Sequence, residues 1–262
     1  MMRALHTATT GLASQQLNMD VVANNLANVN TTGFKKARAE FQELLYQTLE
    51  VAGSETALGT QEPTSLQVGL GVRAGSTQRM FTQGSLESTG NPLDVAIEGD
   101  GFFQVIRENG EIAYTRAGVF NRDSLGNVVN PDGLPLEPSL SVPDNVTQIT
   151  ISRTGLVSAL TGGTTTPVQL GQLELARFAN PAGLTSLGGN LYQPSAASGD
   201  AITGLPGEDA FGTVAQEFLE GSNVNIAEEL VDMIVGQRAY EINSKAVQTV
   251  DEMLQMANNM RR

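Results

Sequence analysis

Residues 1–34 read MMRALHTATTGLASQQLNMDVVANNLANVNTTGF, and the spacing of their apolar side chains predicts a helix. Apolar residues recur at alternating intervals of three and four, which is the seam of a helix that packs against another helix. Gln15 is the one polar residue of this seam, and the apolar members are Leu5, Ala8, Leu12, Met19, Val22, Leu26 and Val29. The pattern therefore predicts that the N-terminal segment is a helix packed against another helix.

The polar side of this helix is nearly uncharged, since Arg3 and Asp20 are the only formal charges over residues 1–34. A solvated helix face normally carries Lys and Glu. Amides and hydroxyls can instead be buried with satisfied hydrogen bonds and without desolvating ions. We therefore expect protein around this helix, and we expect the turn TTGF at 31–34 to end it, with Gly33 in a left-handed conformation.

The other end of the chain carries a second and longer helical pattern. SNVN at 222–225 supplies N-cap residues. Five apolar residues then recur every seven positions: Ile226, Met233, Tyr240, Val247 and Leu254. Together with Leu5, Leu12, Met19, Val22, Leu26 and Val29 of the first helix, they form the predicted assembly interface.

The middle of the chain predicts short strands, because Gly-, Thr- and Val-rich segments with alternating apolar residues are separated by turns. DVAIEGDGFFQVI at 94–106 predicts a pair of strands around a tight turn at 99–101. The predicted fold class is α+β, in which long terminal helices form a coiled-coil-like inner domain beside a central all-β domain. The predicted boundaries are 1–34 for the first helix, 35–67 for a connector, 68–220 for the β domain and 221–262 for the second helix.

The connector contains YQTLEVAGSETALGTQEPTSL at 46–66, which is polar and rich in small residues. Such a stretch is ordinarily a flexible loop. The alternative is an extended arm that lies against neighbouring subunits and makes the assembly rigid. Its apolar anchors would be Tyr46, Leu49, Val51, Leu58 and Leu66, with Pro63 holding the chain extended.

Composition argues against several functions. The formal net charge of −13 disfavours nucleic acid and anionic membrane surfaces as partners. The sequence has no run of 18 apolar residues, so we predict no membrane insertion. It also has no continuous apolar region near the N-terminus, so we expect no cleavable signal peptide. Cysteine is absent and His6 is the single histidine, which leaves little for thiol, imidazole or metal chemistry.

Three segments could suggest chemistry, and each has a simpler interpretation. GDG at 99–101 lacks the full spacing of a phosphate-binding loop. The segment 121–126 resembles a calcium loop but carries Leu125 where an oxygen ligand is required. Asp94, Glu98 and Asp100 form a cluster of the kind that any acidic β protein offers. We therefore predict no catalytic, cofactor-binding or metal-binding residues, and no enzyme.

Two long motifs carry a family resemblance. ANNLANVNTTGFKK at 23–36 resembles the N-terminal signature of the bacterial flagellar rod and hook family, and SNVNIAEELVDMIVGQRAYEINSKAVQTVDEML at 222–254 resembles its C-terminal signature. Residues 67–105 are similar to the start of that family's β domain. The motif residues carried over from the first signature are Asn24, Asn25, Leu26, Ala27, Asn28, Thr32, Gly33 and Phe34.

The resemblance implies a structural subunit of a hollow helical filament in the flagellar basal body, with the rod crossing the periplasm. In that family the terminal helices form a coiled-coil layer around the export channel. The implied partners are further copies of the chain, the proximal rod and hook proteins, the surrounding L- and P-ring proteins, and the flagellar type III export apparatus. Chain length and the connector favour the distal rod, the rigid shaft that transmits torque, over the proximal rod or hook.

Two functions from other classes compete with this interpretation. A secreted β-domain adhesin would use exposed aromatic platforms, but the chain has four Tyr and no Trp. An enzyme acting on cell-wall glycans would need a constellation of reactive groups, and none stands out.

Overall fold

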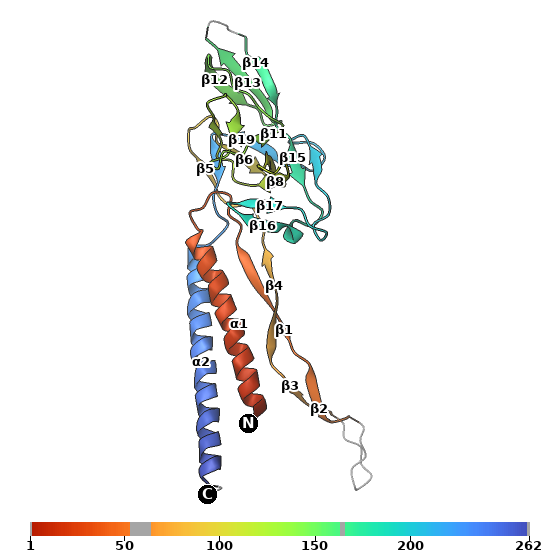
Figure 1. The fold of residues 1–262 in the computed structure, drawn as a ribbon, viewed down its shortest axis with the longest axis vertical. Helices are drawn as coiled ribbons and strands as arrows, with labels where there is room; N and C mark the ends of the chain where they lie inside the picture. Colours follow the sequence, from red (N-terminus) through yellow and green to blue (C-terminus); the bar gives the residue numbers. More distant parts are fainter. Residues whose placement is uncertain (1, 53–63, 163–165, 261–262) are drawn as a thin grey trace. The chain divides into compact units, whose positions relative to one another are not determined.

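The computed structural model describes residues 2–52, 64–162 and 166–260. The chain begins with helix α1 (Met2–Ala27) and ends with helix α2 (Ile226–Asn259), and the sequence between them forms strands, which gives the α+β class (Figure 1). The chain divides into two compact units. The helical unit comprises Met1–Ala27, Ala37–Gln78 and Asn225–Arg262, and the β unit comprises Asn28–Lys36 and Arg79–Val224.

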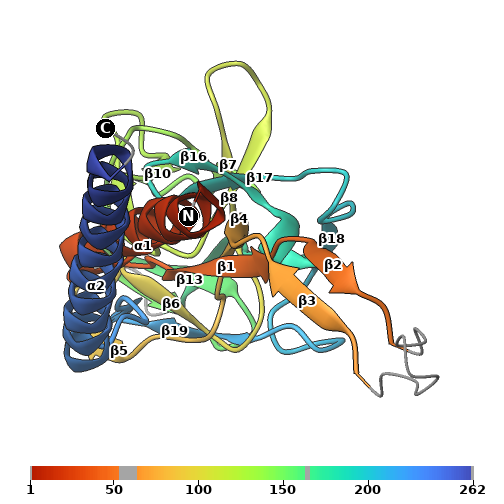
Figure 2. The ribbon, with the colours of Figure 1, turned by 90° about the horizontal axis from the view of Figure 1, so that it is seen from below.

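In the helical unit, α1 and α2 run side by side (Figures 1 and 2). Small residues allow the close approach: a Cβ atom added to Gly236 would lie 3.3 Å from Cγ of Met19, and one added to Gly11 would lie 3.1 Å from Nδ2 of Asn243. The predicted N-cap is confirmed, because Oδ1 of Asn225 accepts a hydrogen bond from the N–H of Ala227. Coiled-coil geometry for the two helices stays a prediction.

Helix α1 ends at Ala27, not within the turn at 31–34 as predicted. Asparagine is a poor helix former that competes for backbone hydrogen bonds, and Asn28 begins a turn in which its carbonyl accepts from the N–H of Thr31 at 3.1 Å. Val29 therefore lies beyond the helix to which its seam position was assigned. Gly33 does adopt the predicted left-handed conformation, with φ of 70°.

The connector is a β-ribbon in its described parts. Strand β1 (Ala37–Glu43) pairs with β4 (Val72–Arg79), and β2 (Tyr46–Glu50) pairs antiparallel with β3 (Leu66–Gly69). Two backbone hydrogen bonds join the pairs, from the N–H of Leu44 to Gly71 O at 2.8 Å and from the N–H of Leu70 to Leu45 O at 3.3 Å. We call residues 37–50 and 66–78 the arm. Residues 68–78, which were predicted to belong to the β domain, therefore pair with the connector.

The β unit is built from several small sheets. The largest has the strand order β11-β7-β8-β17-β16, and a second has the order β12-β13-β14. Their strands are β7 (Phe103–Ile106), β8 (Ile112–Thr115), β11 (Leu136–Glu137), β12 (Val146–Ile151), β13 (Leu156–Thr161), β14 (Val168–Gln172), β16 (Thr185–Gly188) and β17 (Leu191–Gln193). A short 3-10 helix, η1 (Pro181–Gly183), precedes β16.

The remaining strands of the β unit form two-stranded pairs, several of which join distant parts of the sequence. Each pair is antiparallel. The pairs are β5 (Leu86–Ser88) with β20 (Phe218–Glu220), β6 (Val95–Glu98) with β19 (Thr213–Gln216), β9 (Asn121–Arg122) with β10 (Val128–Val129), and β15 (Leu175–Arg177) with β18 (Ile202–Gly204).

The predicted strand pair at 94–106 is wrong, because β6 and β7 belong to different sheets. The turn between them carries positive φ angles at Gly99 and Gly101. The guanidinium of Arg116 donates to the carbonyls of both glycines, at 2.8 Å and 2.7 Å. The turn therefore wraps around a buried cation and leads β7 away from β6.

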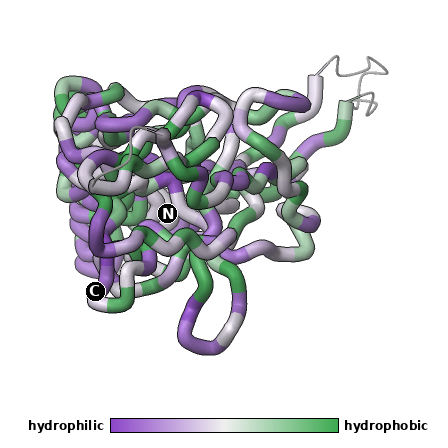
Figure 3. Tube along the Cα trace, turned by 90° about the horizontal axis from the view of Figure 1, so that it is seen from above, coloured by the Kyte–Doolittle hydropathy of each residue, from purple (hydrophilic) through white to green (hydrophobic). Residues whose placement is uncertain are grey.

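Two hydrophobic clusters form the core of the β unit. One is largely aliphatic and includes Val95, Ile97, Val105 and Leu175. The other is aromatic, with edge-to-face contacts such as the one between Tyr114 and Phe178 at a ring-centroid distance of 4.8 Å. Hydrophobic and hydrophilic segments are interspersed along the trace (Figure 3), as expected for short strands with one buried face.

Replacing Gly33 by Ala should destabilise the protein strongly. A Cβ atom at Gly33 would lie 2.5 Å from the backbone N of Ala117, in addition to the strain of the left-handed conformation. Gly110 is a matched control, because it also has a positive φ but has nothing within 4 Å of an added Cβ. In urea unfolding, Gly110→Ala should cost about 1–2 kcal/mol and Gly33→Ala more than about 3 kcal/mol. Equal costs would show that the clash is relieved.

Candidate functional site

The predicted seam of α1 is turned away from solvent. Val22 is buried, and the other seam positions named for the assembly interface are half-buried: Leu5, Leu12, Met19, Leu26 and Val29. On α2 the predicted row divides. Met233, Val247 and Leu254 are half-buried, but Ile226 and Tyr240 are exposed.

In the N-terminal part of α2 the buried positions are taken by small and polar residues. The apolar heptad row therefore predicted burial for two residues, Ile226 and Tyr240, that are exposed. Glu229 and Gly236 are the buried residues of this helix. The side chain of Asn25, which is buried on α1, donates from Nδ2 to Oε2 of Glu229 at 3.1 Å. A seam defined only by apolar residues therefore misses the polar part of the contact.

Helix α2 also carries a broad apolar surface, of which the sequence reasoning singled out only Ile226. Its six members have between 44% and 67% of their surface exposed, and we call them the α2 patch: Ile226, Leu230, Val231, Ile234, Val235 and Ile242. Large contiguous apolar patches on a single chain mark interaction surfaces. A count of β-branched and Leu residues on all sides of the helix, rather than of one row, would have found the patch.

The tip of the arm is also apolar and exposed. Every residue of β2 is exposed, and the exposed large apolar side chains of the arm and its tip are Leu45, Tyr46, Leu49, Val51 and Leu66. Leu45, with 82% of its surface exposed, was not predicted. Leu58 and Pro63 lie outside the described residues. A two-stranded ribbon without a packed face is marginal in water, so the arm tip also has the character of a docking element.

The first family motif builds a junction inside the helical unit through Asn25. Its Nδ2 donates to the carbonyl of Ala37 at 2.9 Å, and its Oδ1 accepts from the N–H of Ala37 at 3.0 Å. Together with the bond to Glu229, one amide links α1, β1 and α2. The neighbouring motif residues Asn24 and Ala27 are exposed.

The same motif continues into the β unit. The carbonyl of Thr32 accepts from Nδ2 of Asn190 at 3.0 Å. The ring of Phe34 is buried, and the guanidinium of Arg79 lies 5.8 Å from its centroid. The structure thus brings Thr32, Gly33 and Phe34 into contact with the β unit, whereas Asn25 acts in the helical unit.

A buried group of three charges follows directly after Phe34, and we call it the ionic clasp. The Lys35 Nζ lies 2.6 Å from Oε1 of Glu220, and the Arg116 Nε lies 2.8 Å from Oε2 of the same carboxylate. The side chains of Lys35, Arg116 and Glu220 have 0%, 4% and 0% of their surface exposed. Lys35 also donates to Thr82 O at 2.7 Å.

The carboxylate of Glu220 is held ionised by its partners. Burial raises the pKa of Glu220, but the charges and hydrogen bonds of Arg116 and Lys35 outweigh burial and hold the pKa below its ordinary value. Burial lowers the pKa of Lys35, and the attraction of Glu220 opposes this shift. The clasp therefore contains two cations and one anion.

Asn223 of the second motif reinforces the clasp from the other end of the chain. Its Nδ2 donates to the carbonyls of Met80 at 2.8 Å and Thr82 at 3.2 Å, and its Oδ1 accepts from the N–H of Lys36 at 2.7 Å. Residues 33–36 and 220–223 therefore meet inside the β unit, which is a physical role for both signatures.

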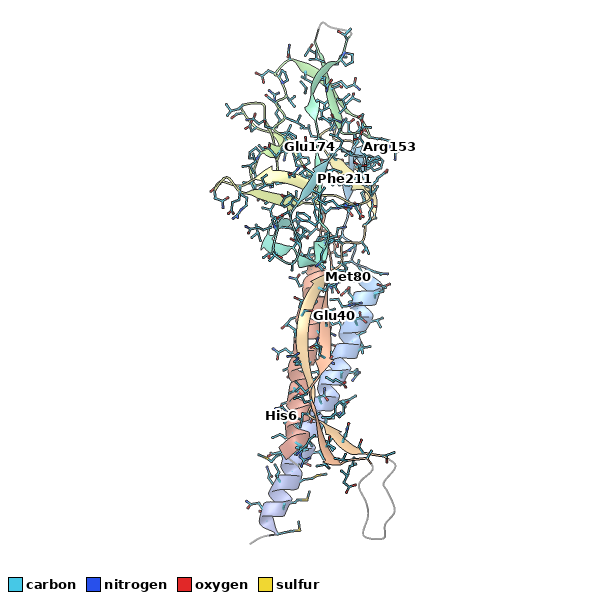
Figure 4. The ribbon with its side chains drawn as sticks, turned by 90° about the vertical axis from the view of Figure 1, so that its right-hand side faces the viewer. His6, Glu40, Met80, Arg153, Glu174 and Phe211 are labelled. Atoms are coloured by element: carbon cyan, nitrogen blue, oxygen red, sulfur yellow. The ribbon has the colours of Figure 1, made fainter. Side chains whose placement is uncertain are left out.

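The remaining candidates for chemistry are dispersed. Asp94 accepts from Thr89 and Asn91, whereas Glu98 pairs with Arg153 at 2.8 Å on the surface (Figure 4). His6 is exposed on α1, with its Nδ1 3.3 Å from Leu70 O (Figure 4).

The turn at 121–126 is organised by its own side chain, since Oδ1 of Asp123 accepts from the N–H groups of Leu125 and Asn127. Within the described ranges, no three His, Cys, Asp or Glu residues are grouped so as to hold a metal ion. No described helix is long and apolar enough to span a membrane.

Family models match the chain in three places. Residues 5–35 match the flagella basal body rod protein model, residues 96–159 match the flagellar hook protein FlgE/F/G D1 domain, and residues 215–260 match the flagellar basal body rod FlgEFG protein C-terminal model. The flagellar basal-body rod protein FlgG of Borreliella burgdorferi is 51% identical over 100% of both chains. The chain belongs to the FlgG family of flagellar basal-body rod proteins.

Other FlgG proteins agree over nearly the whole length. The protein of Caulobacter vibrioides is 48% identical over 99% of this chain and 100% of its own, and that of Bacillus subtilis is 38% identical over 100% of both. The resemblance predicted from the two terminal motifs is therefore confirmed. The chain is a structural protein of the flagellar basal-body rod.

Replacing Glu220 by Gln should destabilise the protein by about 3–5 kcal/mol at neutral pH, because two buried cations lose their counter-ion. Glu98→Gln is the matched control, since it breaks the exposed pair with Arg153 and should cost less than about 1 kcal/mol. Urea unfolding at pH 7 measures both. A cost for Glu220→Gln as small as that of the control would contradict the role of the clasp.

The stabilisation by Glu220 should also depend on pH. Its folded pKa is lowered, so the unfolded chain binds a proton first as the pH falls. The contribution is fully present above the unfolded value of about 4.3 and is lost as the pH falls through the folded pKa. Arg116 and Lys35 are the charged groups that lower the pKa of this carboxylate. The difference in unfolding free energy between wild type and Glu220→Gln should shrink over that range, and a constant difference would contradict the assignment.

Proposed function

We propose that the chain is a subunit of the distal rod, which polymerises helically into a rigid hollow drive shaft that transmits torque to the hook and encloses the export channel. The observation that carries this proposal is the α2 patch, an apolar surface on a structural protein that a single chain leaves exposed. A patch on one copy that meets a different surface on the next copy generates an open helical filament when the repeated rotation does not close into a ring.

In this proposal the two terminal segments, 1–34 and 221–262, form a coiled-coil-like inner domain. The connector at 35–67 supplies most of the arm. Residues 68–78 of the predicted outer β domain, 68–220, complete the arm, and the rest of that domain lies outside the inner domain. The predicted seam and the α2 patch would then share the contacts between neighbouring helices. Charges are sparse on α1, which supports burial on most of its sides.

The proposed partners are other copies of the chain, the proximal rod and hook proteins, the surrounding L- and P-ring proteins and the flagellar type III export apparatus. The proposed location is the rod as it crosses the periplasm. This role requires no catalysis, cofactor, nucleic acid or membrane insertion.

Replacing Ile234 by Asp should block polymerisation without unfolding the chain. Ile234 is 58% exposed, so the monomer loses little, whereas a charge in a dry interface would cost several kcal/mol in each contact. Leu125→Asp is the matched control, because Leu125 is exposed in the β unit. Circular dichroism reports folding, and electron microscopy of the concentrated protein reports tubes. Tubes formed by Ile234→Asp would exclude the α2 patch from the interface.

The seam itself can be tested at Leu26, which is half-buried on α1. Leu26→Asp should leave the β unit folded, as judged by its protected amides, but should prevent rod assembly and motility. Motile cells whose rods carry this substitution would refute the interface assignment.

Deleting residues 46–66 should leave polymerisation intact but give filaments that curve. The deletion removes β2 and the start of β3 and retains β1 and β4, which pair next to α1. We infer that the exposed arm tip resists sliding between subunits. The curvature of assembled filaments measures this effect, and the double variant Leu45→Ser/Leu49→Ser should reproduce part of it. Equally straight filaments after the deletion would reduce the segment to a passive linker.

A further inference from the structure

The central strand β6 depends on a segment near the end of the β unit. Val95, Ala96 and Ile97 are almost completely buried. Among the strands of the described residues, β6 pairs only with β19, in the register of Thr213 opposite Glu98 and Gln216 opposite Val95. A buried strand must satisfy its backbone groups, so β6 requires residues 213–216.

The ionic clasp depends on the same segment. Lys35 and Arg116 come from early parts of the β unit, and their carboxylate, Glu220, comes from its last strand. Carbonyls of Thr82, Gly99 and Gly101 satisfy hydrogen bonds of these cations but do not neutralise their charge. Until Glu220 arrives, burying Lys35 and Arg116 leaves two uncompensated charges, which is strongly unfavourable.

Glu220 also closes the backbone around the clasp. Its Oε1 accepts from the N–H of Gly84 at 2.9 Å, and its carbonyl accepts from the N–H of Gly33 at 2.7 Å. Arg116 also donates hydrogen bonds to the carbonyls of Gly99 and Gly101 in the loop that connects β6 to β7. Strands β6, β7 and β8 are thus linked through one guanidinium to a carboxylate that is 104 residues further along the chain.

We propose that residues 213–220 act as a folding latch: β6, β7 and β8 gain stable structure only when this segment docks and Glu220 neutralises Lys35 and Arg116. The β unit of an incomplete chain therefore stays open. The latch closes after nearly all of the β unit is available, with only the segment of α2 still to follow.

The latch has a use in export that rests on the proposed function. In this proposal the early strands of an exported chain leave the channel before residues 213–220, and they stay open until those residues have also emerged. Because Glu220 lies in β20, the last strand, the early strands β6, β7 and β8 fold stably only after β20 has docked. The latch itself is a property of one chain and does not require assembly.

Refolding of the full-length chain tests the proposal, with pulse-labelling hydrogen exchange read out by mass spectrometry. Amides in 95–115 and in 213–220 should become protected in the same kinetic phase. Protection of 95–115 in an earlier phase than 213–220 would overturn the latch. The measurement uses dilute monomer, so the formation or failure of tubes has no bearing on it.

A charge-free variant separates the clasp from the other contacts of the segment. In Lys35→Met/Arg116→Met/Glu220→Leu, the hairpin of β7 and β8 should become protected about tenfold sooner than 213–220, because no buried charge awaits its partner. The control Arg122→Met/Asp144→Leu removes a surface ion pair that lies outside both monitored segments, and it should keep the single phase. A single phase in the charge-free variant would overturn the assignment to charge, and the wild-type measurement stands if that variant does not fold.

Discussion

The carboxylate of Glu220 is the contact on which the β unit depends. It binds two cations that lie 185 and 104 residues earlier in the chain, and all three side chains are buried. A buried ion pair is weak evidence for added stability, because desolvation offsets most of the attraction. Its consequence is specificity: burying Lys35 and Arg116 together leaves two uncompensated charges unless Glu220 is present, and the pairing of β20 with β5 places it there.

Local periodicity made the helices predictable, and its absence hid the clasp. The spacing of Leu5, Leu12 and Met19 follows from helix geometry within a few residues. Arg116 directly follows β8 and Glu220 ends β20, and nothing in their local sequence indicates that they meet. The two terminal motifs predicted the family, but the sequence did not show their physical role. In the structure Lys35 and Asn223 donate hydrogen bonds to the backbone of the same segment, at Thr82 and Met80 respectively.

The extended arm was predicted as an alternative, but the pairing of its strands into a ribbon was missed for a different reason. Strand prediction relies on one buried face, which produces alternation of apolar and polar residues. Strand β2 is exposed along its whole length, and β4 is exposed over most of its residues. Such strands satisfy backbone hydrogen bonds without burying side chains in a single chain, so the sequence lacks the usual pattern. The apolar residues near the arm tip are consequently read as isolated anchors rather than as a paired ribbon.

The two units differ in how much of their apolar surface is buried within a single chain, and this difference links the structure to assembly. The β unit closes two cores and an ionic clasp, and no buried side-chain nitrogen or oxygen of the described residues lacks a hydrogen-bond partner. In the helical unit, Gly236 and Asn243 face α1 at close range, while Ile234 and Val235 stay exposed. An ordinary amphipathic helix turns its large apolar residues inward. Here small and polar residues make the contact within the chain, and the larger apolar side chains remain for contacts with other proteins. We therefore expect the helix pair to gain most of its stability from neighbouring subunits, and we expect the β unit, with its buried cores, to depend on them less.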